Sequence, residues 1–182
     1  MSDAIKVAVI YGSVREGRLC DTVGRWVLEQ IQRREAFAPI VVDPAAEADS
    51  AFAGRLDEAD AFVVVTPEYN HSYPAALKAL IDSYKAEWQA KPVAFVSYGG
   101  ASGGLRAVEH LRHVFAELHA VGIRDGVMFP SVWEQFDEHG QPKQAQRYER
   151  GMQTLLARLA WWAETLRQGR DARDYAQAVM LD

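Results

Sequence analysis

Short apolar segments alternate along the chain with longer amphipathic segments. Five segments have the composition of β-strands, at residues 5–11, 39–42, 61–66, 92–98 and 124–129. The segment at 61–66 (AFVVVT) is continuously apolar instead of alternating, which is typical of a strand buried on both faces of a parallel sheet. Each segment is followed by a turn or by residues with helical spacing.

The longer segments between these strands carry apolar residues three and four apart, as in helices that cover a sheet. They lie at residues 21–35, 45–60, 74–87, 105–121 and 144–167. Pro74 suits a first helical turn, where its missing N–H costs nothing, and Gly122 suits a helix end. We interpret 131–144 as a polar loop, and residues 168–182 give no clear prediction.

Five strands alternating with helices predict one α/β domain over residues 1–182, with helices on both faces of a parallel sheet in three layers. Right-handed crossovers favour a doubly wound sheet, and we predict the strand order 2-1-3-4-5. Ligands of such sheets bind beyond the carboxyl ends of the strands, where the winding reverses. We therefore expect a site built from residues 12–20, 66–73 and 99–104.

Composition narrows the possible functions. The chain has 182 residues, with 20 Lys and Arg against 25 Asp and Glu, which gives a net charge of −5. This balance argues against a general nucleic-acid binder. The single cysteine, Cys20, excludes an internal disulfide and a site of several thiolates. No apolar run is long enough for a membrane span, and the first residues do not resemble a signal peptide, so we expect a cytoplasmic protein.

The first of the three loops follows the first strand and leads into a helix. Helix N-termini present free N–H groups and a positive dipole end, which favour an anion. Ser13 and Thr22 add hydroxyl donors, and Arg15 and Arg18 add charged donors for phosphate oxygens. An ordinary turn with two solvated arginines is the alternative. The glycine fingerprints of Rossmann and P-loop nucleotide sites are both missing.

The second loop, Thr66-Pro67-Glu68-Tyr69-Asn70, offers an aromatic face, an amide and backbone N–H groups that suit a flat heteroaromatic ring. A rigid turn feeding the next helix explains it equally well. Glu68 has no second carboxylate or base spaced to pair with it, so we do not assign it a general-acid role.

The third loop, residues 97–104, has four glycines in six residues. Glycine lets the backbone approach a ligand closely and present bare N–H groups. A flexible turn is the alternative. The convergence of three unusual loops on one crevice favours a ligand site there.

These loops carry motifs that resemble the NADPH-dependent FMN reductase family, which includes flavodoxin-like quinone, azo-dye and chromate reductases. The motifs are Gly12-Ser13-x-Arg15, Thr66-Pro67-Glu68-Tyr69-Asn70 with Pro74-x-x-Leu77-Lys78, and Ser97-x-Gly99-Gly100-x-x-Gly103-Gly104-x-Arg106. The resemblance covers about residues 5–130 and implies a flavodoxin-like fold with bound FMN.

The resemblance also implies which residues bind FMN. The phosphate would be held by Ser13, Arg15, Arg18 and the backbone around Cys20, Asp21 and Thr22. The isoalloxazine would be lined by Pro67, Glu68, Tyr69 and Asn70 on one side, and by Ser97, Gly99, Gly100 and Gly103 on the other. Many members have Ser and Asn where this chain has Arg18 and Cys20, so we expect Arg18 to replace a hydroxyl contact with a charge.

The implied activity is hydride transfer from NADPH or NADH through FMN to quinones or similar small oxidants, by a ping-pong mechanism. No catalytic side chain and no metal are required. Two alternatives stay open, a flavodoxin-type electron carrier and a non-catalytic FMN-binding interaction protein. A redox role for Cys20 is a further alternative, because Arg18 and a helix N-terminus would lower its pKa.

Members of the family resembling this chain are commonly dimers or tetramers. We therefore expect a homodimer or homotetramer, with no nucleic-acid or membrane partner. The helix that carries Leu77, Leu80, Ile81 and Tyr84 would suit a subunit contact if its apolar side chains were partly exposed.

Overall fold

A computed structural model describes residues 4–46 and 52–179 of the chain. Its five strands are β1 (Ile5–Tyr11), β2 (Phe37–Val42), β3 (Ala61–Pro67), β4 (Pro92–Tyr98) and β5 (Val121–Phe129). They form one parallel sheet of order β2-β1-β3-β4-β5. This confirms the predicted topology, and the change of winding direction lies between β1 and β3.

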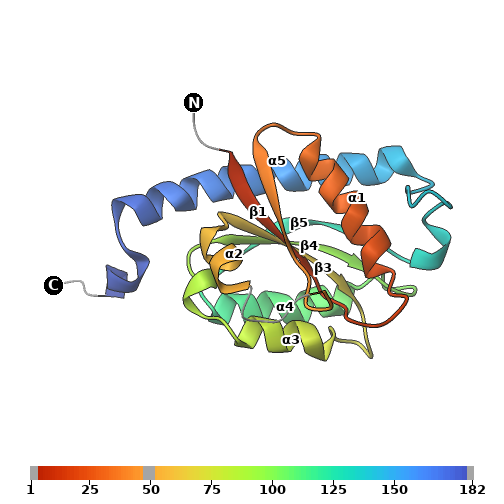
Figure 1. The fold of residues 1–182 in the computed structure, drawn as a ribbon, viewed down its shortest axis with the longest axis horizontal. Coiled ribbons are helices and arrows are strands. Elements are labelled where there is room, and N and C mark those ends of the chain that lie inside the picture. Colours follow the sequence, from red (N-terminus) through yellow and green to blue (C-terminus); the bar gives the residue numbers. More distant parts are fainter. Residues whose placement is uncertain (1–3, 47–51, 180–182) are drawn as a thin grey trace.

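Among the described residues, five α-helices cover the two faces of this sheet (Figure 1). They are α1 (Cys20–Gln32), α2 (Phe52–Glu58), α3 (Ala75–Asp82), α4 (Leu105–Glu117) and α5 (Ala145–Ala172). Short 3-10 turns are η2 (Ala86–Trp88), η3 (Val132–Glu134) and η4 (Tyr175–Val179). Within the described residues, no helix is both long and apolar enough to cross a bilayer.

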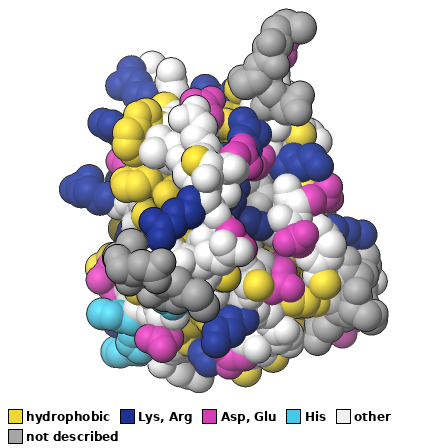
Figure 2. Space-filling view, turned by 90° about the vertical axis from the view of Figure 1, so that its left-hand side faces the viewer, with side chains coloured by type: hydrophobic (Ala, Val, Ile, Leu, Met, Phe, Trp, Pro, Cys, Tyr) yellow, Lys and Arg dark blue, Asp and Glu magenta, His cyan; other side chains and the backbone are white. Residues whose placement is uncertain are grey.

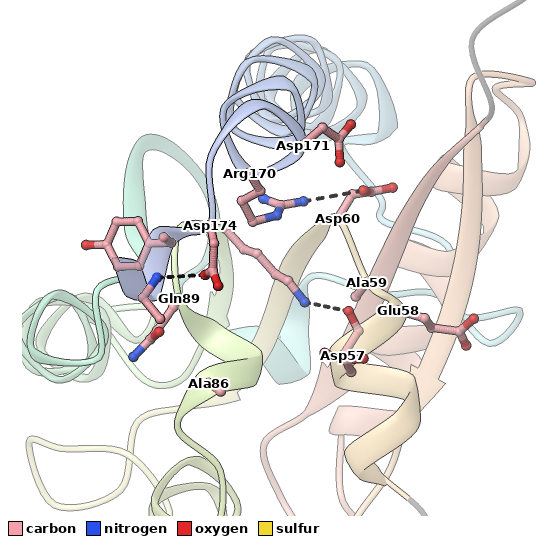
Figure 3. A pocket seen from close by; sticks show the side chains of 12 residues that line it. Asp57, Glu58, Ala59, Asp60, Ala86, Gln89, Arg170, Asp171 and Asp174 are labelled. Atoms are coloured by element: carbon pink, nitrogen blue, oxygen red, sulfur yellow. Dashed lines mark hydrogen bonds and ion pairs between the residues drawn. The ribbon is translucent and has the colours of Figure 1, made fainter. Parts of the chain in front are cut away.

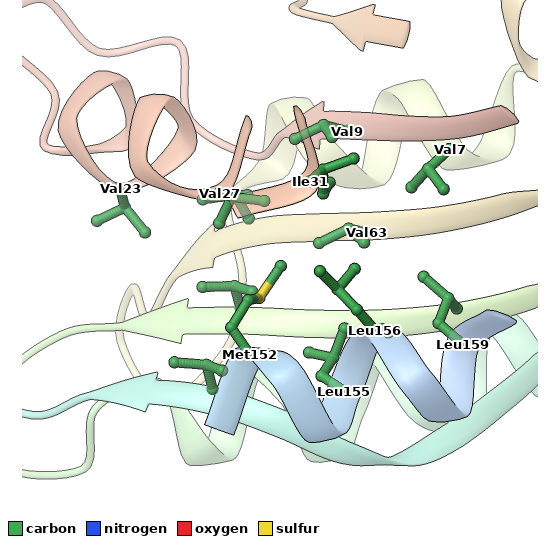
Figure 4. Packing of buried hydrophobic residues seen from close by; sticks show 14 of the residues in the cluster. Val7, Val9, Val23, Val27, Ile31, Val63, Met152, Leu155, Leu156 and Leu159 are labelled. Carbon is green, nitrogen blue, oxygen red and sulfur yellow. The ribbon is translucent and has the colours of Figure 1, made fainter. Parts of the chain in front are cut away.

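Two apolar layers hold the helices against the sheet. On one face, valines and leucines of α1 and α5 pack against β1 and β3, as Val27 and Leu156 do around Val63 (Figure 4). On the other face, α2, α3 and α4 cover the sheet through residues that include Leu56 and Phe115. The central strands β1, β3 and β4 are therefore buried on both sides, as their uninterrupted apolar composition predicts. The edge strands β2 and β5 are only partly buried.

The helix α3 ends earlier than expected, at Asp82. The buried Trp88 indole donates hydrogen bonds to the carbonyl oxygens of Ile81 and Tyr84, both at 3.1 Å, and so satisfies the end of the helix. Leu77, Leu80 and Ile81 are buried within the chain. Their apolar side chains face their own sheet, so they do not form the accessible subunit contact that we considered.

The boundary between α4 and β5 also differs from the prediction, because Gly122 does not end a helix. His119 takes a positive φ of 60°, which stops the helix, and Val121 already pairs with Pro92 in the sheet. The strand β5 therefore begins three residues before the predicted position. In contrast, α5 runs beyond the predicted end, to Ala172.

The surface carries no broad patch of one charge sign on the face that Figure 2 shows, which is the left-hand side of Figure 1. Basic and acidic side chains are interspersed there. Such mixing agrees with the modest net charge.

Candidate functional site

The three unusual loops leave the same edge of the sheet and contact one another. Glu68 donates its backbone N–H to the carbonyl of Tyr98 at 3.0 Å, which joins the second loop to the end of β4. The Ser13 and Tyr69 hydroxyls are 2.8 Å apart, which joins the first loop to the second. The predicted convergence is therefore present in the fold.

Arg15 lies exposed beside this contact. Its guanidinium carbon is 3.7 Å from the centre of the Tyr69 ring, a cation–π arrangement that holds the side chain over the second loop. Within residues 4–46 and 52–179, Arg15 forms no ion pair. Its charge is thus available to an anion at the mouth of the first loop.

Arg18 does not supply the free charge that we expected. Its guanidinium donates to both carboxylate oxygens of Asp43, to Asp21 and to the Ser13 carbonyl. The pair with Asp43 is nearly buried, with side-chain exposures of 8% and 12%. Sequence reasoning missed Asp43, which follows β2 and is distant in sequence.

The Cys20 thiol is also placed differently from the redox alternative. The side chain is fully buried, and its sulfur lies 3.6 Å from the Val65 carbonyl oxygen as a weak donor. Burial raises the pKa of this thiol and outweighs the opposite effect of Arg18. The thiol is therefore protonated and shielded at neutral pH, and the expected lowering of its pKa was wrong.

The N-terminus of α1 remains suited to an anion. Leu19 is its N-cap and provides no side-chain hydrogen bond, so the first-turn N–H groups around Cys20, Asp21 and Thr22 are uncapped by side chains. Asp21 is half-exposed and paired with Arg18, which neutralises a carboxylate that would otherwise repel phosphate.

The second loop is a tight, braced turn. The backbones of Tyr69 and Ser72 exchange two hydrogen bonds of 2.8 and 2.9 Å, and Asn70 and His71 between them both have positive φ values. Asn tolerates this conformation better than most residues. The loop therefore presents Pro67, Tyr69 and Asn70 in a fixed arrangement.

Glu68 braces the second loop against the start of α4. Its carboxylate accepts hydrogen bonds from the Arg106 backbone N–H at 3.1 Å and from Arg106 Nε at 2.7 Å. Burial opposes its ionisation, but hydrogen bonds from Ser102 and Arg106 outweigh that effect and lower the pKa of Glu68. It is ionised at neutral pH, which agrees with our not assigning it a general-acid role.

The glycines of the third loop divide into two kinds. Gly103 and Gly104 have positive φ values, and a Cβ on Gly103 would lie 2.5 Å from Met128 Cγ. Gly103 is needed by the fold itself, and Ser97 donates its hydroxyl to the Gly103 carbonyl at 2.9 Å. Gly103 and Ser97, which we predicted as ligand-binding residues, therefore stabilise the third loop itself.

Gly99 and Gly100 are different, because the fold leaves room for a side chain at both. A Cβ on Gly99 would meet atoms only at ordinary contact distances, and one on Gly100 would meet only the Trp133 ring at 3.8 Å. Neither has the positive φ that requires glycine. Bare backbone that internal packing does not demand fits a flat ligand lying against it.

Comparison with known proteins then decides the family. A sequence profile described as NADPH-dependent FMN reductase matches residues 5–134. The chain belongs to the NADPH-dependent FMN reductase family. This confirms the resemblance that the three motifs carry, and the matched region includes all three loops.

Several relatives share this region. An NAD(P)H-dependent FMN reductase of Schizosaccharomyces pombe is 38% identical over 130 residues, which cover 60% of this chain and 64% of that protein. A quinone reductase of Escherichia coli is 31% identical over 140 residues, or 66% of this chain and 74% of the relative. The chain thus spans slightly less than two thirds of the fission-yeast protein's length.

Solved structures share the fold. FerB, a flavoenzyme NAD(P)H:(acceptor) oxidoreductase from Paracoccus denitrificans, superposes with a TM-score of 0.70 at 20% identity, over 89% of this chain and 98% of its own. A flavodoxin variant from Pseudomonas aeruginosa gives a TM-score of 0.58 over 88% of this chain. The fold is therefore flavodoxin-like.

A cavity of about 600 Å³ lies at the opposite edge of the sheet, where the strands begin (Figure 3). Its lining includes Asp60, which precedes β3, and Lys91, which precedes β4. Arg170 contacts Asp60 at 3.6 Å and the Ala90 carbonyl at 2.6 Å, so it holds the end of α5 against this edge. The cavity is separate from the three loops.

Proposed function

We propose that the chain is an FMN-dependent NAD(P)H oxidoreductase that reduces quinones or similar small, flat oxidants. The observation that carries the proposal is the bare backbone of Gly99 and Gly100, which internal packing does not require. It lies on the same sheet edge as Ser13, Arg15 and Tyr69, in a chain of the FMN reductase family.

The phosphate of FMN would bind at the first loop. The uncapped N-terminus of α1 offers N–H groups, and Arg15 offers an exposed charge that is not in an ion pair among the described residues. Arg18 would not contact the phosphate itself. Its hydrogen bonds to Asp43 and to the Ser13 carbonyl would hold the first loop in the conformation that surrounds the phosphate. These residues fit a phosphate without a further cation.

The ring system would lie between the second and third loops. Pro67, Tyr69 and Asn70 present one wall, and Gly99 and Gly100 present the other. When bound, FMN supplies hydride acceptance and two-electron transfer to the oxidant. The residues of these two loops would position the ring with one face exposed, so that nicotinamide and oxidant could use that face in turn, as a ping-pong mechanism requires.

No side chain is required to transfer a proton at the ring. Glu68 is ionised and engaged by Arg106, so it braces the loop. The proton that accompanies two-electron reduction of a quinone would come from solvent at the open face. We further propose a cytoplasmic homo-oligomer.

The test is purification followed by steady-state kinetics. We expect a yellow protein that releases FMN on denaturation, oxidises NADPH or NADH with a quinone, and gives parallel double-reciprocal plots. A flavodoxin-type carrier or a non-catalytic partner would bind FMN without such turnover. A protein that neither contains nor binds FMN would refute the proposal, and sedimentation analysis would give the oligomeric mass.

A further inference from the structure

Trp133 is a large apolar side chain left in solvent at the edge of the proposed site. It lies on η3, immediately after β5, and 63% of its surface is exposed. Within the described residues its indole makes no hydrogen bond and no contact with another ring. The fold therefore gives the ring no internal role that would explain its exposure.

The backbone that carries Trp133 is nevertheless held firmly against the third loop. Ser131 donates its N–H to the Gly100 carbonyl at 2.9 Å, and Val132 donates to the Gly99 carbonyl at 3.1 Å. Ser131 adopts a positive φ of 46°, an uncommon conformation that these bonds hold in place. The turn is thus coupled to the two glycines proposed to line the ring.

The indole itself lies close to Gly100. Its Cη2 atom lies 3.8 Å from the position that a Cβ on Gly100 would occupy. Leu105 and Met128, also exposed, flank the third loop, because Met128 packs against Gly103 and Leu105 begins α4. Leu105 and Met128 also line a pocket between α4 and β5, so the exposed apolar ring that the structure places against Gly100 is that of Trp133.

We propose that Trp133 is a specificity-determining residue on which flat aromatic electron acceptors stack beside the open face of the site. The inference rests on the proposed function and names its acceptor class, planar bicyclic quinones. An indole offers a large rigid face at low conformational cost, and offset stacking suits ring systems of this size. Compact inorganic oxidants have no flat ring face, so their reduction should not depend on the Trp133 indole.

The experiment compares Trp133→Ala and Trp133→Phe in the FMN-loaded enzyme, with 2-methyl-1,4-naphthoquinone and ferricyanide as acceptors. We expect the alanine variant to raise KM for the naphthoquinone about tenfold and the phenylalanine variant to raise it less. Turnover with ferricyanide and the Kd for FMN should both change by less than about twofold. Trp161→Ala, which removes a similarly exposed indole (58%) from α5, should leave both acceptors unaffected.

The outcomes separate the two proposals. A wild-type protein without FMN-dependent NAD(P)H oxidation refutes the proposed function and the acceptor role together. An active wild type whose Trp133→Ala variant keeps its naphthoquinone KM refutes only the stacking role. Equal losses with both acceptors, or a fall in oligomeric mass with KM unchanged, would assign Trp133 to flavin binding or to a subunit contact and also overturn it.

Discussion

Arg18 and Asp43 form a nearly buried, two-point ion pair that joins the first loop to the end of β2. The Nη1–Oδ1 distance is 2.8 Å and the Nη2–Oδ2 distance is 2.5 Å. Arg18 also donates to the Ser13 carbonyl and to Asp21, so one guanidinium ties together both ends of the loop. This pair makes Arg18 a brace of the first loop.

Replacing Asp43 with Asn should therefore destabilise the fold. The substitution leaves the Arg18 charge buried without its main partner, and removing one partner of such a pair costs about 3 kcal/mol. Asp21→Asn removes the half-exposed partner of the same guanidinium and should cost about 1 kcal/mol or less. Urea denaturation of both variants measures the difference, and equal losses would contradict the assignment.

The same pair predicts a dependence of stability on acid. Burial opposes the ionisation of Asp43, but the Arg18 hydrogen bonds outweigh it and lower the pKa of this carboxyl below its ordinary value. A lowered pKa contributes stability that is present above about pH 4 and lost as the pH falls through the folded-state value. The stability difference between wild type and Asp43→Asn should shrink in that acid range. A difference that stays constant with pH would contradict this origin.

Arg15 should contribute to binding of FMN but not of riboflavin, which lacks the phosphate. Loss of a charged hydrogen bond costs about 1.5–3 kcal/mol, so Arg15→Gln should raise the Kd for FMN roughly 10- to 100-fold. Riboflavin affinity should stay within about twofold. Quenching of flavin fluorescence measures both, with Arg25→Gln on the exposed side of α1 as the control. Equal weakening of both flavins would contradict a phosphate contact.

The glycines of the third loop should respond differently to alanine. Gly100→Ala should leave the free energy of unfolding nearly unchanged, because a Cβ there meets only the edge of Trp133, but it should weaken FMN binding. Gly54→Ala adds a Cβ in open space on α2 and should not affect FMN. Gly103→Ala should cost about 2 kcal/mol or more, because the residue has a positive φ and its Cβ would clash with Met128. Thermal unfolding and FMN titration separate these effects, and a Gly100→Ala protein with unchanged FMN affinity would remove the main support for the ring site.

Lys91 should make the stability of the fold depend on pH, independently of the proposed FMN site. Its ammonium donates to the carbonyls of Leu56 and Asp57 at 2.9 and 2.7 Å, at the end of α2. Desolvation lowers the pKa of Lys91 to about 8. The unfolded chain then binds more protons between about pH 8 and pH 10, so this group makes stability rise with pH there. Across that range the free energy of unfolding of the wild type should rise by on the order of 1–3 kcal/mol relative to that of Lys91→Met. If the two free energies of unfolding change with pH in parallel, the lowered pKa is refuted.

The sequence by itself determined the layered architecture of this protein. Uninterrupted apolar strands such as 61–66 require cover on both faces, and helical spacing between them supplies it, so the sheet order and the edge that carries the three loops follow from local pattern and handedness. The loop motifs also identified the family. Glycine, proline and asparagine occur at fixed spacing in them because the local backbone conformation of each turn requires these residues.

Only the tertiary structure decided what individual side chains do at that edge. Arg18 has the sequence character of a phosphate ligand, yet Asp43 from a different strand engages its charge. Cys20 begins a helix beside an arginine, yet burial under the sheet edge dominates its pKa. Trp133 lies 33 residues after Gly100 in the sequence and lies beside it only because β5 returns next to β4. Desolvation and partner choice depend on contacts between distant segments, which periodicity and composition do not encode.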